Sequence, residues 1–423
     1  MARTVPVAVP GIGWRVGVIR RLRGLSRDTV AGLVGISRGE LAGLETARRW
    51  CECRGLVEDF ATALGCSVID LTGQPYLPMD RGSADALAGL PGIRDVIHGV
   101  MVDELPDRAA RPLPELHYGV REAQEHLDQD RVGLAGRELG ALLAELHIHA
   151  SAKDPDIARA ALPVLVRACY LAALIADRIG HADLVLAIAA RGRDAATRSG
   201  DPVMLALARL GLALAWTHIG ARRQAGAAIA LVLAELDSLA DPTAADTGPA
   251  EMVGLAHLMA AKLAAHTGRA ADAHHYLAEA RALAERTGER NTAGQHFGPA
   301  LVTLGTLSVR VDLGEGADVA EQTPPERITL AALPSPVHTG RYHFHLARAL
   351  AQTSDGARDT EAIRHLNLAD QAAPVLLHNH PIAREVLASL TYRARRQARD
   401  LDRMVNRFGI TRSVGTRRSG WRC

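Results

Sequence analysis

Apolar positions between residues 25 and 45 recur at the three- and four-residue spacing of α-helices, in two short stretches separated by a glycine. Ser26 and Ser37 each precede one stretch, where a serine hydroxyl can accept hydrogen bonds from the free amides of the first turn. Gly35 stands between them, where a sharp turn favours a residue without a Cβ atom. The pattern predicts two helices joined by a tight turn, with these residues facing inward: Val30, Ala31, Leu33, Val34, Ile36, Leu41 and Leu44.

Three further helices are predicted around this pair. One covers residues 14–23, a second ends at Gly65, and a third, short one begins at Ser67. Their apolar residues at helical spacing are Val16, Ile19, Leu22, Leu56, Val57, Phe60, Ala61, Leu64, Val68, Ile69 and Leu71. We therefore expect one compact unit of five short helices at the N-terminus.

Residues 83–410 are rich in alanine and leucine at helical spacing, with no convincing strand. Four segments align on a turn glycine: Gly180, Gly220, Gly268 and Gly356. Ala273, Tyr276 and Ala280 follow Gly268 at the small and bulky spacing of the second helix of a tetratricopeptide repeat. The glycines are 40, 48 and 88 residues apart, so we expect degenerate repeats. Such helix pairs bury their apolar faces by stacking, which predicts a curved α-solenoid.

Charge is nearly balanced over the 423 residues, at +2, but it is unevenly distributed. The first 73 residues contain ten arginines and seven acids, a net charge of +3. Residues 391–423 contain ten arginines and two acids, a net charge of +8, which leaves −9 for the middle. Basic ends favour contact with an anionic polymer, and arginine suits bidentate contacts with phosphate and guanine.

A set of spaced residues in the N-terminal helices carries a family resemblance: Gly24, Leu25, Ser26, Ala31, Gly35, Ser37, Glu45, Ala61, Leu64 and Leu71. In these residues the chain resembles the five-helix DNA-binding domain of the Xre (lambda-repressor-like) transcription factors. It departs from that family at Arg27, Ala47 and Cys51, where Gln, Gly and Pro are usual. Together with the repeats, it is similar to actinobacterial Xre regulators that carry a tetratricopeptide-like sensor region.

By this resemblance, the third helix enters the major groove of double-stranded DNA and the second lies across the backbone. Arg38 is the expected base-reading residue, since a guanidinium can bind guanine O6 and N7 together. Arg20 and Glu45 are expected to form a structural brace. The other expected DNA-facing residues are Ser37, Glu40 and Gly43 beside Arg38, and Arg27, Arg48 and Arg49 at phosphates. A homodimer of such domains predicts an inverted-repeat operator with half-sites about one helical turn apart.

An alternative hypothesis explains the same residues without DNA. Short helix-turn-helix patterns occur by chance in chains rich in alanine and leucine, and the arginines would then be ordinary solvated charge. Gly39 and Gly43 inside the third helix each cost on the order of 1 kcal/mol relative to alanine. The competing function is a protein-interaction scaffold of helical repeats whose N-terminal domain does not bind DNA specifically.

Motifs for catalysis, metal binding and membrane insertion are missing from the sequence. No phosphate-binding Gly-rich loop with Lys, His-Glu-x-x-His or Gly-x-Ser-x-Gly motif occurs, so neither enzymatic activity nor a cofactor is expected. The spaced histidine pairs would point apart on a helix, so no metal site is expected. Five scattered cysteines fit no disulfide framework and indicate a reducing cytoplasm. The most apolar run, 203–219, contains Arg209 and predicts a buried helix, with no membrane contact.

Residues 382–408 combine an apolar stripe with several arginines. The stripe consists of Val386, Leu390, Leu401, Val405 and Phe408, and the arginines are Arg393, Arg395, Arg396, Arg399 and Arg403. We interpret this stretch as a helix that caps the solenoid with a solvated basic face, and a second DNA contact is the alternative.

The sequence therefore predicts an all-α fold, with a lambda-repressor-like domain followed by a tetratricopeptide-like α-solenoid. The expected divisions are a flexible N-terminus at 1–13, a helix-turn-helix domain at 14–73, a linker at 74–82, the repeat domain at 83–410 and a disordered basic tail at 411–423. The expected function is that of a cytoplasmic transcriptional regulator whose solenoid mediates dimerisation, signal sensing or both. The expected effector is a peptide, a small molecule or a protein, and the sequence does not choose among them. The few asparagines give peptide binding no support.

Overall fold

Helices make up all the regular structure of the part of the chain that the computed structural model describes, and no strand occurs there. The all-helical class predicted from the sequence is therefore confirmed. The described residues are 11–100, 105–292, 294–322, 333–353, 356, 358–394 and 399–410. Most of the expected flexible N-terminus and the whole expected tail at 411–423 lie outside them.

Five short helices form what we call the N-terminal unit: α1 (Ile12–Leu22), α2 (Arg27–Val34), α3 (Arg38–Glu45), α4 (Arg54–Leu64) and α5 (Val68–Thr72). Ser26 begins α2 by accepting a hydrogen bond from the Thr29 N–H at 3.0 Å. Gly35 ends that helix at a φ of +77°, a conformation that glycine adopts without strain. One expectation is wrong, because Leu33 is 64% exposed and faces away from the core.

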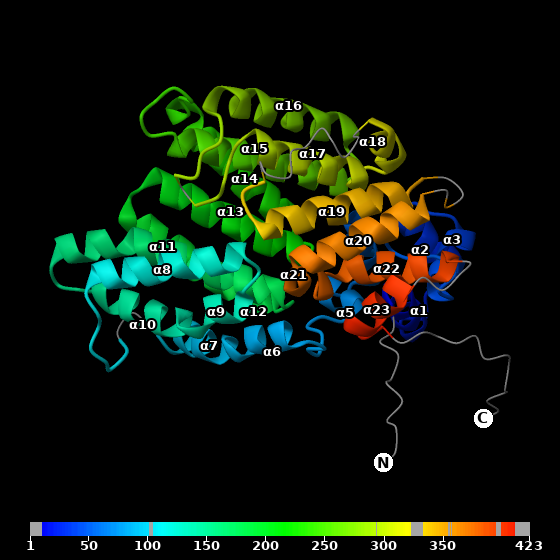
Figure 1. Cartoon of the computed structure of the whole chain (residues 1–423), viewed down its shortest axis with the longest axis horizontal. Coiled ribbons are helices and arrows are strands. Elements are labelled where there is room, and N and C mark those ends of the chain that lie inside the picture. The colour runs from blue at the N-terminus through cyan, green and yellow to red at the C-terminus, as the bar shows by residue number, and fades with distance from the viewer. Residues whose placement is uncertain are drawn as a thin grey trace, which may run out of the picture.

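The remaining helices form what we call the array. They are α6 (Arg81–Ala88), α7 (Leu90–Gly99), α8 (Leu113–Asp128), α9 (Val132–Arg137), α10 (Leu139–Ala150), α11 (Pro155–Arg178), α12 (Ala182–Ser199), α13 (Pro202–His218), α14 (Arg222–Leu236), α15 (Gly248–His266), α16 (Ala270–Thr287), α17 (Pro299–Asp312), α18 (Gly316–Gln322), α19 (Pro336–Ala351), α20 (Asp359–Ala372), α21 (Pro374–His378), α22 (Pro381–Arg393) and α23 (Arg399–Arg407). From α10 to α20, the helices pack mainly against their neighbours in the sequence, except that α17 also packs closely on α15 and α19 (Figure 1).

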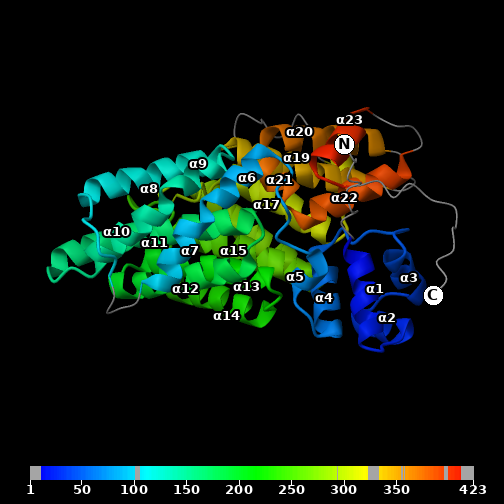
Figure 2. The ribbon, with the colours of Figure 1, turned by 90° about the horizontal axis from the view of Figure 1, so that it is seen from below.

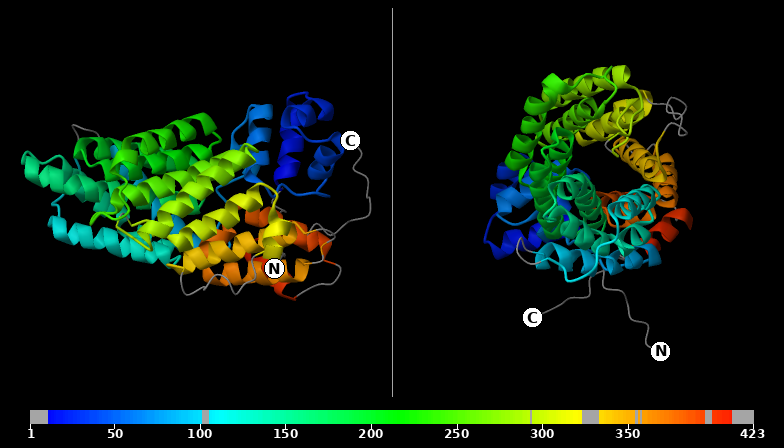
Figure 3. Two further views of the ribbon diagram at one scale, coloured as in Figure 1. Left: turned by 90° about the horizontal axis from the view of Figure 1, so that it is seen from above. Right: turned by 90° about the vertical axis from the view of Figure 1, so that its left-hand side faces the viewer.

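The four aligned glycines each lie in a turn between two packed helices. Gly180, Gly220, Gly268 and Gly356 join α11 to α12, α13 to α14, α15 to α16 and α19 to α20, all with φ between +65° and +82°. The helices wind into a ring, which Figure 3 shows end on in its right-hand view. The glycine alignment therefore identified helix hairpins, although Gly314, at φ +83° between α17 and α18, escaped it.

The apolar core runs from the N-terminal unit into the end of the array. Buried side chains of α1 to α5 belong to the same cluster as those of α17, α19, α20, α22 and α23. Figure 2 shows the N-terminal unit beside the C-terminal helices. The segment expected to be a linker is also held, because Gln74 donates a hydrogen bond to the Asn379 carbonyl and Arg384 lies 4.1 Å above the Tyr76 ring. The N-terminal unit is thus fixed to the array.

Three apolar stretches are buried by this packing. The run expected to form a buried helix is α13, which packs between α12 and α14. The helix α11 is long and apolar enough to cross a membrane, but two thirds of the residues in its most apolar stretch are buried inside the fold. The stripe predicted near the C-terminus is divided between α22, α23 and Phe408 just after α23, and its five apolar side chains are buried.

His378 of α21 joins the neighbouring helix α20 to a segment almost 300 residues away in the sequence. Its Nδ1 lies 2.9 Å from an oxygen of Asp80, just before α6, and its Nε2 lies 2.6 Å from an oxygen of Asp370 on α20. Burial lowers the pKa of His378, but hydrogen bonds to the two carboxylates outweigh burial and raise the pKa to about 9. The protonated ring therefore links the beginning of the array to its end.

We expect this stabilisation to disappear at alkaline pH. The folded pKa lies above the ordinary value of 6.5, so the contribution is complete below pH 6.5 and is lost as the pH rises through about 9. His378→Gln should lower the free energy of unfolding by on the order of 2 kcal/mol near pH 6 and by much less near pH 9.5. Urea unfolding measures both values, with the exposed His98 of α7 changed to glutamine as a control. A pH-independent difference would contradict the ionic role.

Candidate nucleic-acid interface

The helix α3 presents one face to the surface at an outer end of the molecule (Figures 1 and 2). Its inner residues Leu41 and Leu44 are buried in the N-terminal unit. A capping box closes its first turn: Ser37 Oγ accepts a hydrogen bond from the Glu40 N–H at 3.1 Å, and Glu40 Oε2 accepts one from the Ser37 N–H at 2.9 Å. This cap stabilises the start of a helix that two interior glycines weaken.

Arg38, the expected base-reading residue, lies on the exposed face of α3. Its side chain is 68% exposed, and its Nη1 lies 3.6 Å from a carboxylate oxygen of Asp28 on α2. An ion pair between two exposed side chains contributes about 0–1 kcal/mol. The guanidinium can therefore leave Asp28 for another anion at little cost.

Glu45 holds two arginines behind this face. Its Oε1 accepts a hydrogen bond from Arg20 Nε at 2.5 Å, and its Oε2 accepts one from Arg27 Nε at 2.7 Å. Burial raises the pKa of Glu45, but the hydrogen bonds from the two arginines prevail and lower it below the ordinary value. The structure thus contains the brace of Arg20 and Glu45, and it adds Arg27, which we had expected at a phosphate, to the same buried carboxylate.

The remaining expected contacts lie around the end of α3. Arg49 donates a hydrogen bond to Glu40 at 2.9 Å, and its side chain covers Gly43, where an added Cβ would lie 3.3 Å from it. Arg48 is exposed and has no side-chain partner among the described residues. Ala47 adopts a φ of +53°, in the left-handed region that suits glycine. The Xre family, which the N-terminal helices resemble, usually has glycine at the position of Ala47.

A second buried carboxylate, Glu58, attaches the N-terminal unit to the array. It lies on α4, and its side chain is 1% exposed. Arg222 of α14 donates a hydrogen bond to it at 2.6 Å, and His266 of α15 lies 3.4 Å away. Burial raises its pKa, but His266 and the arginines lower it to about 2. The backbones also approach closely, because a Cβ on Gly55 would lie 2.4 Å from the His266 carbonyl oxygen.

Two further contacts extend this attachment. Arg348 of α19 donates hydrogen bonds to Asp312 at 2.7 Å and to the backbone carbonyl of Glu52 at 2.9 Å. Glu385 of α22 accepts hydrogen bonds from the backbone N–H groups of Ile12 and Cys51, both at 2.9 Å. The hydrogen bond from the Ile12 N–H to Glu385 caps the start of α1, where the helix dipole favours a negative charge. Cys51, a departure from the similar family, is fully buried at this junction.

Sequence reasoning did not find this junction. Glu58 is a charged residue within an amphipathic helix, and such residues normally mark the exposed face. A related signal was present in Arg54 and Gly55, since a glycine inside a helix can indicate the close approach of another backbone. Two of the partners of Glu58, Arg222 and His266, lie more than 160 residues away in the sequence, so no local pattern identifies them.

The fold and the site together define an all-helical protein that displays a capped and braced two-helix element on a repeat-like array. No group of three metal-ligating side chains occurs among the described residues. Neither a family model, nor a curated protein, nor a solved structure matches the chain.

Proposed function

We propose that the protein is a sequence-specific, DNA-binding transcriptional regulator whose N-terminal unit is a lambda-repressor-like helix-turn-helix domain. One observation carries the proposal: α3 is packed on one face, capped at its start and exposed on the other face, which bears Arg38. A helix held in this way can enter the major groove with its N-terminal residues toward the bases. Arg48 and Arg49 lie beside it for contacts with phosphates.

The array has the role of a tetratricopeptide-like solenoid in this proposal. Because the junction at Glu58 and Glu385 fixes the N-terminal unit to the array, the array sets the position of the DNA-reading face. In a homodimer, the spacing between two reading faces would follow from the shape of the array, and the operator would be an inverted repeat with half-sites about one helical turn apart. The protein acts in the cytoplasm in this proposal and has no catalytic role.

Replacing Arg38 by alanine tests the assignment of the reading face. Arg38→Ala should reduce discrimination between operator and unrelated DNA by about 1–3 kcal/mol, because a bidentate contact with a base is lost. Arg48→Ala is the matched control, and it should weaken binding to all sequences alike and flatten the salt dependence. Both are measured by footprinting at matched salt, on sites first identified by genomic immunoprecipitation.

Two outcomes would count against the proposal. If Arg38→Ala leaves the footprint unchanged, α3 does not read the bases through this residue. If immunoprecipitation finds no discrete genomic sites and the purified protein binds DNA no better than nonspecifically, the scaffold hypothesis replaces it.

A further inference from the structure

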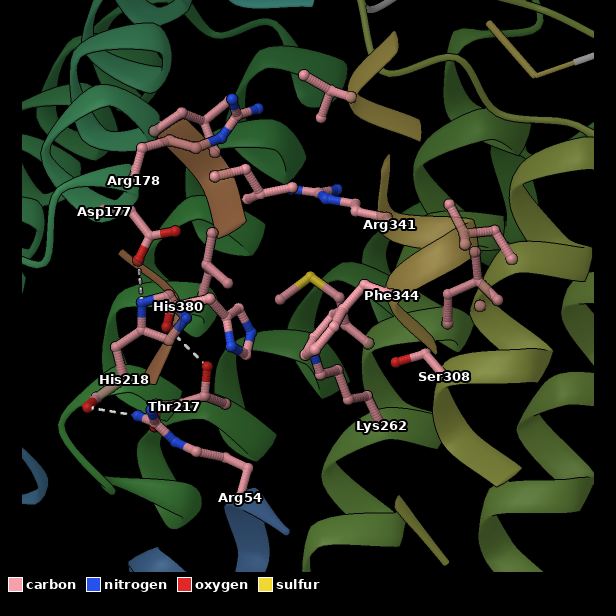
Figure 4. A pocket seen from close by; sticks show the side chains of 18 of the residues that line it. Arg54, Asp177, Arg178, Thr217, His218, Lys262, Ser308, Arg341, Phe344 and His380 are labelled. Carbon is pink, nitrogen blue, oxygen red and sulfur yellow. Dashed lines mark hydrogen bonds and ion pairs between the residues drawn. The ribbon is translucent and has the colours of Figure 1, made fainter. Parts of the chain in front are cut away.

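A cavity of about 450 Å³ lies on the inner side of the array, next to the N-terminal unit (Figure 4). Its wall includes residues of α8, α11 to α15, α17, α19, α21 and α22, together with Arg54 and Glu58 of α4. The volume falls in the range of pockets that bury a small organic molecule.

Part of the wall of this cavity is apolar. It includes Leu207, Leu210, Leu255, Leu258, Leu304 and Phe344, contributed by four helices of the array. Together they offer an apolar surface to a non-polar body of matching size. Such a surface with a few polar groups converging on it is typical of a ligand pocket.

The cavity also contains two cations without partners. Lys262 of α15 is deep in the fold, yet its side chain is accessible because it points into the cavity, and Arg341 of α19 reaches into the same space (Figure 4). Among the described residues, neither side chain has a hydrogen bond or an ion pair. Burial lowers the pKa of both, that of Arg341 to about 10, because charge is costly in such surroundings.

The carboxylates of the cavity wall are all committed to other groups. Their shortest contacts are Glu58 with Arg222, Asp128 with Gln124 and His296, Asp177 with His218, and Asp312 with Arg348. Asp312 acts on Lys262, and Asp177 and Asp130 act on Arg341, only through longer-range charge attraction, because no described carboxylate forms an ion pair with either cation. Lys262 and Arg341 therefore offer free N–H donors to an anion that enters the cavity.

From these two cations and the apolar wall of the same cavity, we infer that the cavity is the binding site of a small organic anion with an apolar body. The anionic group, a carboxylate or a phosphate, accepts hydrogen bonds from Lys262 and Arg341, and the body packs on the leucines. Charge-assisted hydrogen bonds of this kind are the strong ones. A cation would meet two like charges, and a neutral molecule would leave both unpaired.

Binding of a fluorescent pair with one skeleton tests this inference on the full-length protein. The anion 8-anilinonaphthalene-1-sulfonate should bind about tenfold or more tightly than N-phenyl-1-naphthylamine, which lacks the sulfonate. Lys262→Met and Arg341→Met should each weaken binding of the sulfonate about tenfold and leave the neutral compound nearly unaffected. Competition by decanoate and by decyl phosphate, with decanol as the neutral control, then separates carboxylate from phosphate recognition.

The matched control is Lys153→Met, which removes the other lysine of the chain from an exposed site between α10 and α11. Lys262→Arg keeps the positive charge and should therefore retain binding of the sulfonate. This variant keeps the test informative if Lys262→Met misfolds. Lys262→Met should also raise the Tm of the free protein, because it removes a positive charge that lies near Arg341 and Arg348, whereas the loss of a structural lysine would lower it. Equal binding of the two probes to the wild type, or equal loss in Lys153→Met and Lys262→Met, would overturn the inference.

The cavity reaches the N-terminal unit through Arg54, which donates a hydrogen bond to the His218 carbonyl at 2.8 Å beside the cavity. That the anion acts as an effector on DNA binding rests on the proposed function. The binding experiment contains no DNA, so its failure would remove the anion site alone, and a failure to find genomic sites would remove the regulator alone.

Discussion

Replacing Glu58 by glutamine is expected to lower the free energy of unfolding by about 3–5 kcal/mol, as for other buried pairs that lose one partner. The carboxylate of Glu58 is buried and faces Arg222, Arg54 and His266. A glutamine of the same size keeps the packing but removes the buried counter-charge that these three groups share, and leaves Arg222 only Asp59 and His266 only Asp312. Urea unfolding measures the loss, and limited proteolysis should show cleavage near residues 72–82 as the N-terminal unit detaches from the array.

The control for Glu58 is its neighbour Asp59, which pairs with the same Arg222 at 2.7 Å but is 40% exposed. Asp59→Asn should cost about 1 kcal/mol or less. Since the folded pKa of Glu58 is about 2 and the ordinary value is 4.5, its stabilisation is present above pH 4.5 and is lost as the pH falls toward 2. The wild type and Glu58→Gln should therefore converge in acid. Equal effects of the two substitutions at neutral pH would show that burial of Glu58 has no energetic role.

Glu45→Gln is expected to have a similarly large effect, about 3–5 kcal/mol, confined to the N-terminal unit. Glu45 is 9% exposed as a residue and neutralises Arg20, which is 8% exposed. Arg20 also donates a hydrogen bond to the Leu25 carbonyl, before α2, so its position fixes the entry of that helix relative to α3. Hydrogen exchange should show faster opening of α1, α2 and α3, while the amides of α11 to α16 keep their protection.

The control for Glu45 is Asp28→Asn, which breaks the exposed pair with Arg38 and should cost about 1 kcal/mol or less. If exchange accelerates throughout the array in Glu45→Gln, the brace is not local and the N-terminal unit unfolds only together with the rest. That result would locate the cooperative unit in the shared core of α1 to α5 and α17 to α23.

Local patterns identified the helices because short-range physics governs them. Serines at helix starts and glycines at left-handed turns act within a few residues, so Ser26, Ser37, Gly35 and Gly268 were interpretable from their neighbours alone. The exposed Leu33 was misassigned because its spacing fits the apolar stripe of α2, and only the packing of α2 shows which side of that stripe remains uncovered.

By itself, the sequence determined the all-helical class, the five short N-terminal helices, the capped turn between α2 and α3 and the glycine hairpins of the array. Each depends on residues close together in the chain. Only the tertiary structure decided that Arg27 joins Arg20 on Glu45, that Glu58 and Glu385 hold the N-terminal unit on the array, and that Lys262 and Arg341 share a cavity. The physical reason is that the energy of a buried charge depends on which distant groups surround it, and helical periodicity contains no information about those groups.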